Sequence, residues 1–134
     1  MRTLKPQRLK RSDTVAVLSP SAGLPYQFPH VYQHGLKQLQ ERFGLLVKEM
    51  PTAMLAPDAL YKDPKQRAED INRAFADPNV QAIIVSIGGD DSVRILEYLD
   101  LDLILTHPKI IMGYSDATTF LTYLNQQGLV TFNG

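Results

Sequence analysis

A chain of 134 residues in which 44% are hydrophobic is expected to form one domain with a single buried core. It contains no cysteine, which excludes disulfides, thiolate metal sites and thiol nucleophiles. Fourteen basic residues balance fourteen acidic ones, so the composition argues against a nucleic-acid-binding module. No apolar run approaches the roughly 20 residues that a membrane span needs. A soluble cytoplasmic protein that binds neither nucleic acid nor membrane is the simplest expectation.

The positive charge is concentrated at the N-terminus. Five of the fourteen basic residues precede the first acidic residue, Asp13, which leaves nine basic against fourteen acidic residues in the remainder. We interpret residues 1–13 as a basic leader and 14–134 as the folded domain. Such an arm could contact nucleic acid or a membrane surface. It has neither the aromatic residues nor the amphipathic pattern that such contacts use, so a solvated leader is favoured.

Strand and helix signals alternate along the chain. In the first half we expect a strand at 14–19, a helix at 29–43, a strand at 45–49, a loop at 51–61 and a helix that Asp63 and Pro64 open and residues 77–78 end. In the second half we expect a strand at 82–87, a turn at 88–92, a helix reaching Leu99, a strand at 109–113, a turn at 114–116, a helix at 117–127 and a strand beginning at 130–132.

This alternation predicts right-handed βαβ units and therefore an α/β fold, a flavodoxin-like three-layer doubly wound parallel sheet of five strands. The segment 82–87 is apolar on both faces except for Ser86, as expected of a central parallel strand covered by helices. The strand at 130–132 has no helix after it, which leaves one sheet edge poorly covered. We therefore expect the first domain of a longer protein.

Three turns follow predicted strands at 19–23, 88–92 and 113–116. Ligands of open α/β sheets bind at the carboxyl ends of the strands, so these turns can share one site. The last turn, Gly113-Tyr114-Ser115-Asp116, joins strand to helix with almost no loop. It is interpreted either as a nucleophile elbow that lifts Ser115 above the sheet or as a serine that caps a helix.

The Gly88-Gly89-Asp90-Asp91-Ser92 turn lets the backbone pass close to a ligand and directs amides to the rim. As a functional element it is an oxyanion hole or a phosphate cradle. As a structural element it is a flexible turn in which Asp91 or Ser92 caps the following helix.

The three histidines offer no obvious catalytic base for Ser115. His107 precedes the fourth strand and therefore lies at the opposite rim, roughly 20 Å from Ser115. His30 and His34 lie four residues apart on a helix without a third metal ligand, so a polar helix face is favoured over a metal site. His30 begins its helix on the functional rim, so the geometry leaves it open as a base.

The Gly88–Ser92 turn, the Gly113–Asp116 turn followed by Thr118, and Ser19-Pro20-Ser21 together resemble the LD-carboxypeptidase family of serine peptidases, whose relatives include the microcin immunity proteins. Residues 67–85 and 79–134 are also similar to that family. The resemblance covers nearly the entire chain, and the combination of the two turns at this separation makes it specific.

The resemblance implies a two-domain cytoplasmic serine hydrolase without a cofactor or metal, whose N-terminal domain is a flavodoxin-like sheet. It implies that Ser115 is the nucleophile, that the amide of Asp116 is one oxyanion donor, and that an amide of Gly89 or Asp90 is the other. The substrate-binding residues implied are Gly88, Asp91, Ser92, Tyr114, Ser19 and Ser21.

The resemblance further implies cleavage of an L,D-peptide bond of a murein tetrapeptide through a Ser-Glu-His triad. The immunity proteins instead cut a peptide–nucleotide amide, and the Gly-Gly-Asp-Asp-Ser form of the turn looks closer to their branch. The C-terminal domain that would supply the glutamate and histidine has no counterpart in these 134 residues. We therefore expect the chain alone to be inactive. A homodimer stays open as an assembly state.

The sequence is also compatible with two functions that are not hydrolytic. A nucleotide- or phosphate-binding domain could use the Gly88–Ser92 turn without hydrolysis, as the Gly-Gly-Asp turn of NAD kinases does. Those proteins continue the turn with Gly-Thr, whereas Asp91-Ser92 follows here, and two adjacent acids repel a phosphate unless a metal intervenes. The other is a non-catalytic binding domain that has lost its second half.

Overall fold

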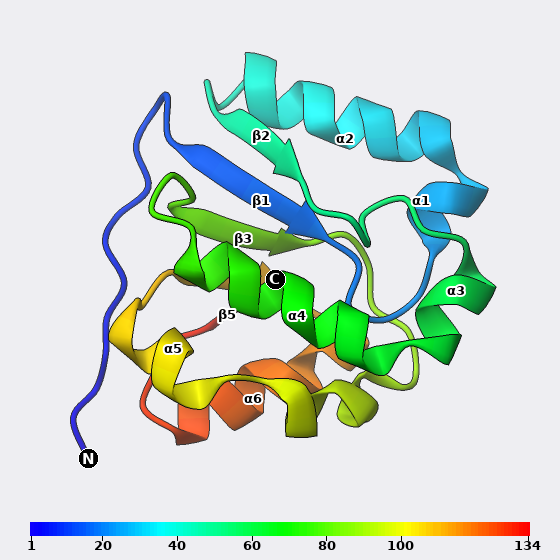
Figure 1. Cartoon of the computed structure of the whole chain (residues 1–134). Coiled ribbons are helices and arrows are strands. Elements are labelled where there is room, and N and C mark those ends of the chain that lie inside the picture. Colours follow the sequence, from blue (N-terminus) through cyan, green and yellow to red (C-terminus); the bar gives the residue numbers. More distant parts are fainter.

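The sheet has five strands, and each lies parallel to its neighbours in the order β2-β1-β3-β4-β5 (Figure 1). The computed structural model describes all 134 residues. The strands are β1 (Thr14–Leu18), β2 (Leu46–Glu49), β3 (Ala82–Val85), β4 (Ile110–Gly113) and β5 (Phe132–Asn133). This order and the all-parallel pairing confirm the predicted flavodoxin-like α/β class.

Helices cover both faces of the sheet, but unequally. Helix α2 (Pro29–Glu41) and the short α1 (Leu24–Gln27) lie on one side, while α4 (Pro64–Ala76), α5 (Leu101–Thr106) and α6 (Thr118–Gln126) lie on the other (Figure 1). Right-handed crossovers explain this division, because β2 lies to one side of β1 and the later strands lie to the other. A cluster of 19 buried residues forms the core under α4, α5 and α6, against three on the α2 side.

The ends of α4 follow from its sequence. The Asp63 carboxylate accepts a hydrogen bond from the Gln66 amide at 3.0 Å, and Pro64 occupies the first helical position, as predicted. At the other end Lys109 Nζ donates to the carbonyl oxygens of Ala74 and Asp77. Burial lowers the pKa of Lys109, although Asp77 opposes that change. This cap joins the end of α4 to the start of β4.

The structure differs from the predicted elements between residues 51 and 106. The expected loop at 51–61 contains α3 (Pro57–Lys62), since Pro57 suits a first helical position. The helix expected to reach Leu99 is a 3-10 helix, η1 (Ser92–Tyr98), and α5 follows it unpredicted. Helix α5 begins where the Asp100 carboxylate accepts a hydrogen bond from the Leu103 amide at 3.0 Å.

The N-terminal segment runs past the amino ends of the strands and pairs with the segment that follows α6 (Figure 1). The Leu4 amide donates to the Gly128 carbonyl at 2.7 Å, and the Val130 amide donates to the Leu4 carbonyl at 2.9 Å. This bridge occupies the first residues of the expected 130–132 strand, so pairing with β4 begins only at Phe132. None of the helices has the length and apolar character needed to cross a membrane.

Candidate active site

The turns after β1, β3 and β4 meet at the carboxyl rim of the sheet, as the strand pattern predicted. The Ala22 amide, in the turn after β1, donates to the Gly88 carbonyl after β3 at 3.1 Å. Gly88 in turn contacts the turn after β4, because a Cβ on Gly88 would lie 3.2 Å from Ser115 Oγ. The three turns therefore form one continuous surface.

Ser115 has a backbone conformation that serine seldom adopts. Its φ of +61° lies in the left-handed region, between β4 and the short 3-10 helix η2 (Ser115–Ala117) that leads into α6. Holding a non-glycine residue there costs about 1–3 kcal/mol and is concentrated at functional sites. The Ser115 hydroxyl is exposed and makes no hydrogen bond within the protein, and the cap positions belong to Tyr114 and Ala117. Helix capping therefore does not account for the serine.

The two glycines of the β3 turn allow close approach to the neighbouring turns. A Cβ on Gly88 would lie 2.9 Å from Ser115 Cβ and 3.2 Å from the Asp116 nitrogen. A Cβ on Gly89 would overlap Ser21 Oγ and would lie 2.9 Å from the Ala22 nitrogen. Distances below 3.0 Å require displacement of the neighbour, so both positions need glycine for this geometry. Gly88 faces the serine, whereas Gly89 faces the turn after β1.

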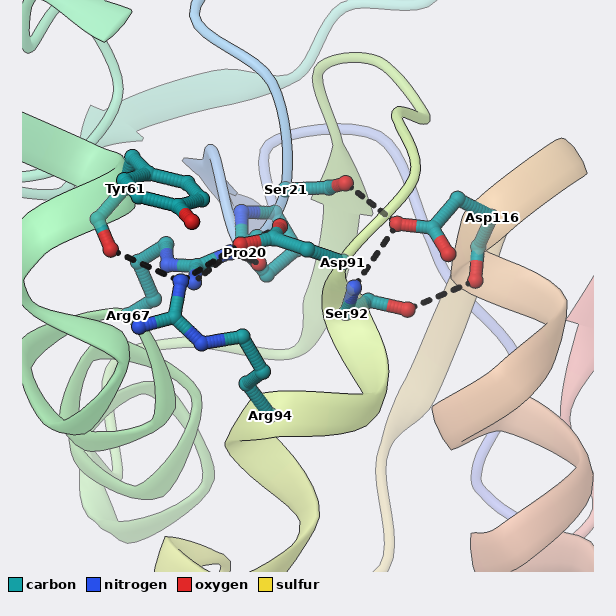
Figure 2. Close-up of polar contacts among 8 residues, drawn as sticks. All are labelled: Pro20, Ser21, Tyr61, Arg67, Asp91, Ser92, Arg94 and Asp116. Atoms are coloured by element: carbon teal, nitrogen blue, oxygen red, sulfur yellow. Dashed lines mark hydrogen bonds and ion pairs between the residues drawn. The ribbon is translucent and has the colours of Figure 1, made fainter. Parts of the chain in front are cut away.

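The Asp116 carboxylate connects the three turns (Figure 2). It accepts a short hydrogen bond from the Ser21 hydroxyl and a 2.9 Å bond from the Ser92 amide. The Ser92 hydroxyl donates to the Asp116 carbonyl at 2.8 Å. Because Asp116 follows Ser115 directly, these bonds fix the peptide group next to the candidate nucleophile.

An ion pair between a buried arginine and a partly buried aspartate lies beside this network (Figure 2). The Arg67 side chain, on α4, is fully buried and donates to both carboxylate oxygens of Asp91 at 2.9 and 3.0 Å. It also donates to the Pro20 carbonyl at 2.9 Å. Arg94 donates to the same carboxylate at 2.9 Å and to the Tyr61 carbonyl, and its guanidinium lies 4.7 Å from the Tyr61 ring centroid. Arg67 thereby fixes both the β1 turn and the β3 turn relative to α4.

The charges of this ion pair shift the ionisation of Asp91. Burial alone would raise its pKa, but hydrogen bonds from Arg67 and Arg94 outweigh burial and hold that pKa below its ordinary value. Asp91 is therefore ionised at neutral pH. Its carboxylate is directed to the two arginines and away from solvent, with 18% of the side chain exposed.

The other predicted site residues lie at the same rim and differ in their burial and their hydrogen bonds. Ser19 is fully buried, donates to the Ala53 carbonyl at 2.9 Å and pairs with Ser86 at 2.6 Å. Ser21 and Ser92 are also buried and engaged with Asp116. Tyr114 and Asp90 are exposed. The proximity of these residues is a structural fact, and the roles assigned to them stay predictions.

Sequence reasoning missed both arginines. Arg67, Ile71 and Ala74 are spaced by four and three residues, so Arg67 shares the inward face of α4 with apolar residues. That spacing was a usable signal for a buried charge. None of the three histidines is hydrogen-bonded to Ser115, and the hypothesis that His30 is its base stays a prediction. His107 caps α5, where its Nδ1 lies 3.0 Å from the Leu103 carbonyl.

These features define a class: a doubly wound parallel α/β domain whose candidate site is built from strand-to-helix turns at one rim. Residues 15–134 match the family model described as the LD-carboxypeptidase N-terminal domain. The chain therefore belongs to the LD-carboxypeptidase family, which confirms the resemblance drawn from the two turns.

Relatives and solved structures extend this assignment. The chain is 36% identical over 131 residues to the "Probable murein peptide carboxypeptidase" of Bacillus subtilis, covering 97% of this chain and 40% of that protein. It is 34% identical to the microcin C7 self-immunity protein MccF of Escherichia coli, covering 91% and 36%. The structure of an MccF-like protein from Streptococcus pneumoniae in complex with AMP superposes with a TM-score of 0.83 at 31% identity, covering 92% and 37%. The chain thus spans about two fifths of the length of its relatives.

Proposed function

We propose that this domain carries the nucleophile of a serine peptidase, and that Ser115 is that nucleophile. The observation that carries the proposal is the conformation of Ser115, which presents a free, exposed hydroxyl at a φ of +61° between a strand and a helix. A nucleophile elbow has this geometry, because the strained turn lifts the hydroxyl above the sheet. Membership of a carboxypeptidase family supports the same role.

The oxyanion of the tetrahedral intermediate would be stabilised by backbone amides at this rim. Attack by Ser115 places negative charge on the substrate carbonyl oxygen, which needs donors about 2.7–3.1 Å away. The Asp116 amide is the first donor proposed, since it follows the nucleophile. The second donor proposed is an amide of Gly89 or Asp90, because these residues follow Gly88, on which an added Cβ would lie 3.2 Å from Ser115 Oγ.

We propose an amide substrate that is either an L,D-peptide bond of a murein tetrapeptide or a peptide–nucleotide bond. The murein substrate is supported by the Bacillus subtilis relative, whose name specifies a murein peptide carboxypeptidase. The nucleotide form is supported by the AMP complex of the Streptococcus pneumoniae relative. The glutamate and histidine of the triad would come from the part of the enzyme that lies beyond the matched segment in these relatives.

The role of Ser115 is tested by substitution in a complete enzyme that contains this domain. Ser115→Ala is expected to lower kcat by about 10⁴ or more, because the remaining catalysis comes only from binding and oxyanion stabilisation. Ser12→Ala is the matched control, since Ser12 is also an exposed serine with positive φ but precedes β1. Near-full peptidase activity in Ser115→Ala would show that another group is the nucleophile.

The 134-residue chain alone is expected to show no detectable turnover of an L,D-tetrapeptide, because the glutamate and histidine of the proposed triad would lie outside it. Robust activity of the purified chain, measured by release of the terminal D-residue, would instead point to His30 as the base.

A second candidate function is nucleotide binding without hydrolysis, favoured by the AMP complex of a relative. In this reading the Gly88–Ser92 turn binds the phosphate. Arg67 and Arg94 already neutralise Asp91, which leaves Asp90 as the acid of the turn that faces solvent. Calorimetric titration with AMP separates the two functions: binding of AMP by a complete enzyme that turns over no amide substrate would favour this candidate.

A further inference from the structure

The turn after β1 holds the Ser21 side chain in a fixed place at the rim of the sheet. Immediately before Ser21, the Pro20 carbonyl accepts a 2.9 Å hydrogen bond from the buried Arg67 side chain. Immediately after it, the Ala22 amide donates to the Gly88 carbonyl at 3.1 Å. Ser21 itself is only 4% exposed. Its position is therefore set by contacts within the protein, to α4 and to the β3 turn.

The single hydrogen of the Ser21 hydroxyl is donated to the Asp116 carboxylate (Figure 2). The same oxygen, Asp116 Oδ2, accepts from the Ser92 amide at 2.9 Å, and the Asp116 carbonyl accepts from the Ser92 hydroxyl. Two turns thus hold the side chain of Asp116, and one of them also holds its backbone. Because a serine hydroxyl has one hydrogen to donate, Ser21 has none left to donate to a substrate.

Gly89 provides the space that the Ser21 hydroxyl occupies. A Cβ on Gly89 would overlap Ser21 Oγ and would lie 3.2 Å from Ala22 Cβ. The glycines with positive φ are Gly44 and Gly128, so the backbone conformation of Gly89 does not itself require glycine. The absence of a side chain at Gly89 is therefore explained by the contact between Ser21 and Asp116.

We propose that Ser21 is a positioning residue, which acts through the Asp116 carboxylate on the backbone amide of Asp116. This inference rests on the proposed function, in which Ser115 is the nucleophile and the Asp116 amide is a donor to the oxyanion. Such donors are effective when they are held in place before the negative charge develops. Ser21 thus contributes to the chemical step, which differs from the substrate-binding role that the family resemblance implies for it.

Steady-state kinetics of a complete enzyme that contains this domain test the proposal, with the murein tetrapeptide or the peptide–nucleotide, whichever the wild type cleaves. Ser21→Ala is expected to lower kcat about 10–100-fold and to change KM by less than about twofold, since a misplaced donor affects the transition state. A raised KM with unchanged kcat would show that Ser21 contacts the substrate and would overturn the proposal. Wild-type values of both constants would overturn it as well.

Thr131→Val is the matched control, because it also removes one hydroxyl hydrogen bond, from Thr131 to the Leu121 carbonyl at 3.1 Å. Thr131 precedes β5 and therefore lies at the opposite end of the sheet, so kcat and KM should both stay unchanged. Near-ultraviolet circular dichroism checks that each variant is folded. An equal fall of kcat in Thr131→Val and Ser21→Ala would mean that the loss is a general structural one, and the proposal would be wrong.

A double-mutant cycle tests whether Ser21 acts through Asp116. Asp116→Ala removes the carboxylate and keeps the backbone amide, so adding Ser21→Ala to it is expected to lower kcat further by less than about twofold. Effects that multiply would show that the two residues act independently, against the proposal. If Asp116→Ala does not fold, the kcat and KM of Ser21→Ala decide alone.

Ser115→Ala, measured in the same enzyme, separates this inference from the proposed function. Near-full activity of Ser115→Ala would refute the proposed function. Loss of activity in Ser115→Ala together with wild-type kinetics in Ser21→Ala would refute only the positioning role of Ser21.

Discussion

At the scale of single residues, Asp91 is the member of the site whose charge matters most for stability. Its carboxylate is the only acidic partner of the fully buried Arg67 guanidinium, which otherwise has the Pro20 carbonyl alone. Arg67 Nε is already buried without a hydrogen bond. Removing one partner of a buried ion pair leaves an uncompensated buried charge. The free-energy cost of that charge exceeds the net stabilisation that the intact pair provides.

Asp91→Ala is therefore expected to lower the free energy of unfolding by about 3 kcal/mol, measured by urea denaturation at pH 7. Asp90→Ala is the matched control, because Asp90 is the adjacent acid, is exposed and makes no hydrogen bond, and it should change stability by less than about 0.5 kcal/mol. Equal losses in the two variants would mean that the turn tolerates an unpaired Arg67.

The same carboxylate predicts a pH dependence. The pKa of Asp91 in the folded state lies below its unfolded value of about 3.9, so its contribution to stability is present above that value and is lost as pH falls through the folded pKa. The difference in unfolding free energy between wild type and Asp91→Asn should shrink as pH falls from about 4 to about 2. A difference that stays constant over this range would contradict the assignment.

Asp70 changes stability with pH in the opposite direction. Burial raises its pKa, although hydrogen bonding to Thr52 opposes that change. Its contribution therefore favours the folded state at low pH and is lost as pH rises through the folded pKa. Because Asp70 is present in both wild type and Asp91→Asn, comparison of the two proteins isolates the effect of Asp91.

At the scale of elements, the β3 turn is the segment with the least room for change. A methyl group on Gly88 would meet Ser115 Cβ at 2.9 Å, so Gly88→Ala is expected to lower the unfolding free energy by about 1–3 kcal/mol. Gly35→Ala is the control on α2, where nothing lies within 4 Å of an added Cβ, and it should stabilise by up to about 1 kcal/mol. Thermal denaturation of both variants measures the contrast. A neutral Gly88→Ala would mean that the two turns separate easily.

The elements also show what the sequence could predict. All five strands and helices α2, α4 and α6 were predicted to within a few residues, because long apolar periodicity and turn residues mark them. Helix α5 was missed because Leu101–Thr106 has only six residues and its apolar run has no distinct period. Helix α3 was missed because the prolines of 51–61 were interpreted as loop residues.

The candidate site was predictable only in part. The turns and Ser115 lie at strand ends, so strand order brings them to one rim. The pairing of Arg67 with Asp91 joins α4 to the β3 turn, and no local pattern predicts a contact that depends on how a helix packs on the sheet. The left-handed backbone conformation of Ser115, which the nucleophile-elbow hypothesis requires, also could not be read from the sequence; its φ of +61° shows it.

At the scale of the whole molecule, the N-terminal segment is part of the domain. Leu4 packs against the main core and pairs with residues 128–130 through two backbone hydrogen bonds. Leu4→Ala should lower the unfolding free energy by about 1–2 kcal/mol, less than a fully buried leucine because Leu4 is half-buried. Leu46→Ala is the control, since Leu46 is 59% exposed on β2 and should change stability by less than about 0.5 kcal/mol. Equal, small effects on chemical denaturation would show that the N-terminal pairing contributes little.

The Leu4–Leu129 bridge also bears on how the protein is made on the ribosome. The segment around Leu4 is translated before β1, whereas its pairing partner, Leu129, follows β4 and α6. Until Leu129 has been translated, the residues around Leu4 therefore lack this native contact, even after β1, β2 and β3 have assembled. Such a long-range contact forms late, because closing so large a loop is entropically unfavourable. The basic N-terminal residues thus stay accessible to chaperones and proteases until translation has passed Val130.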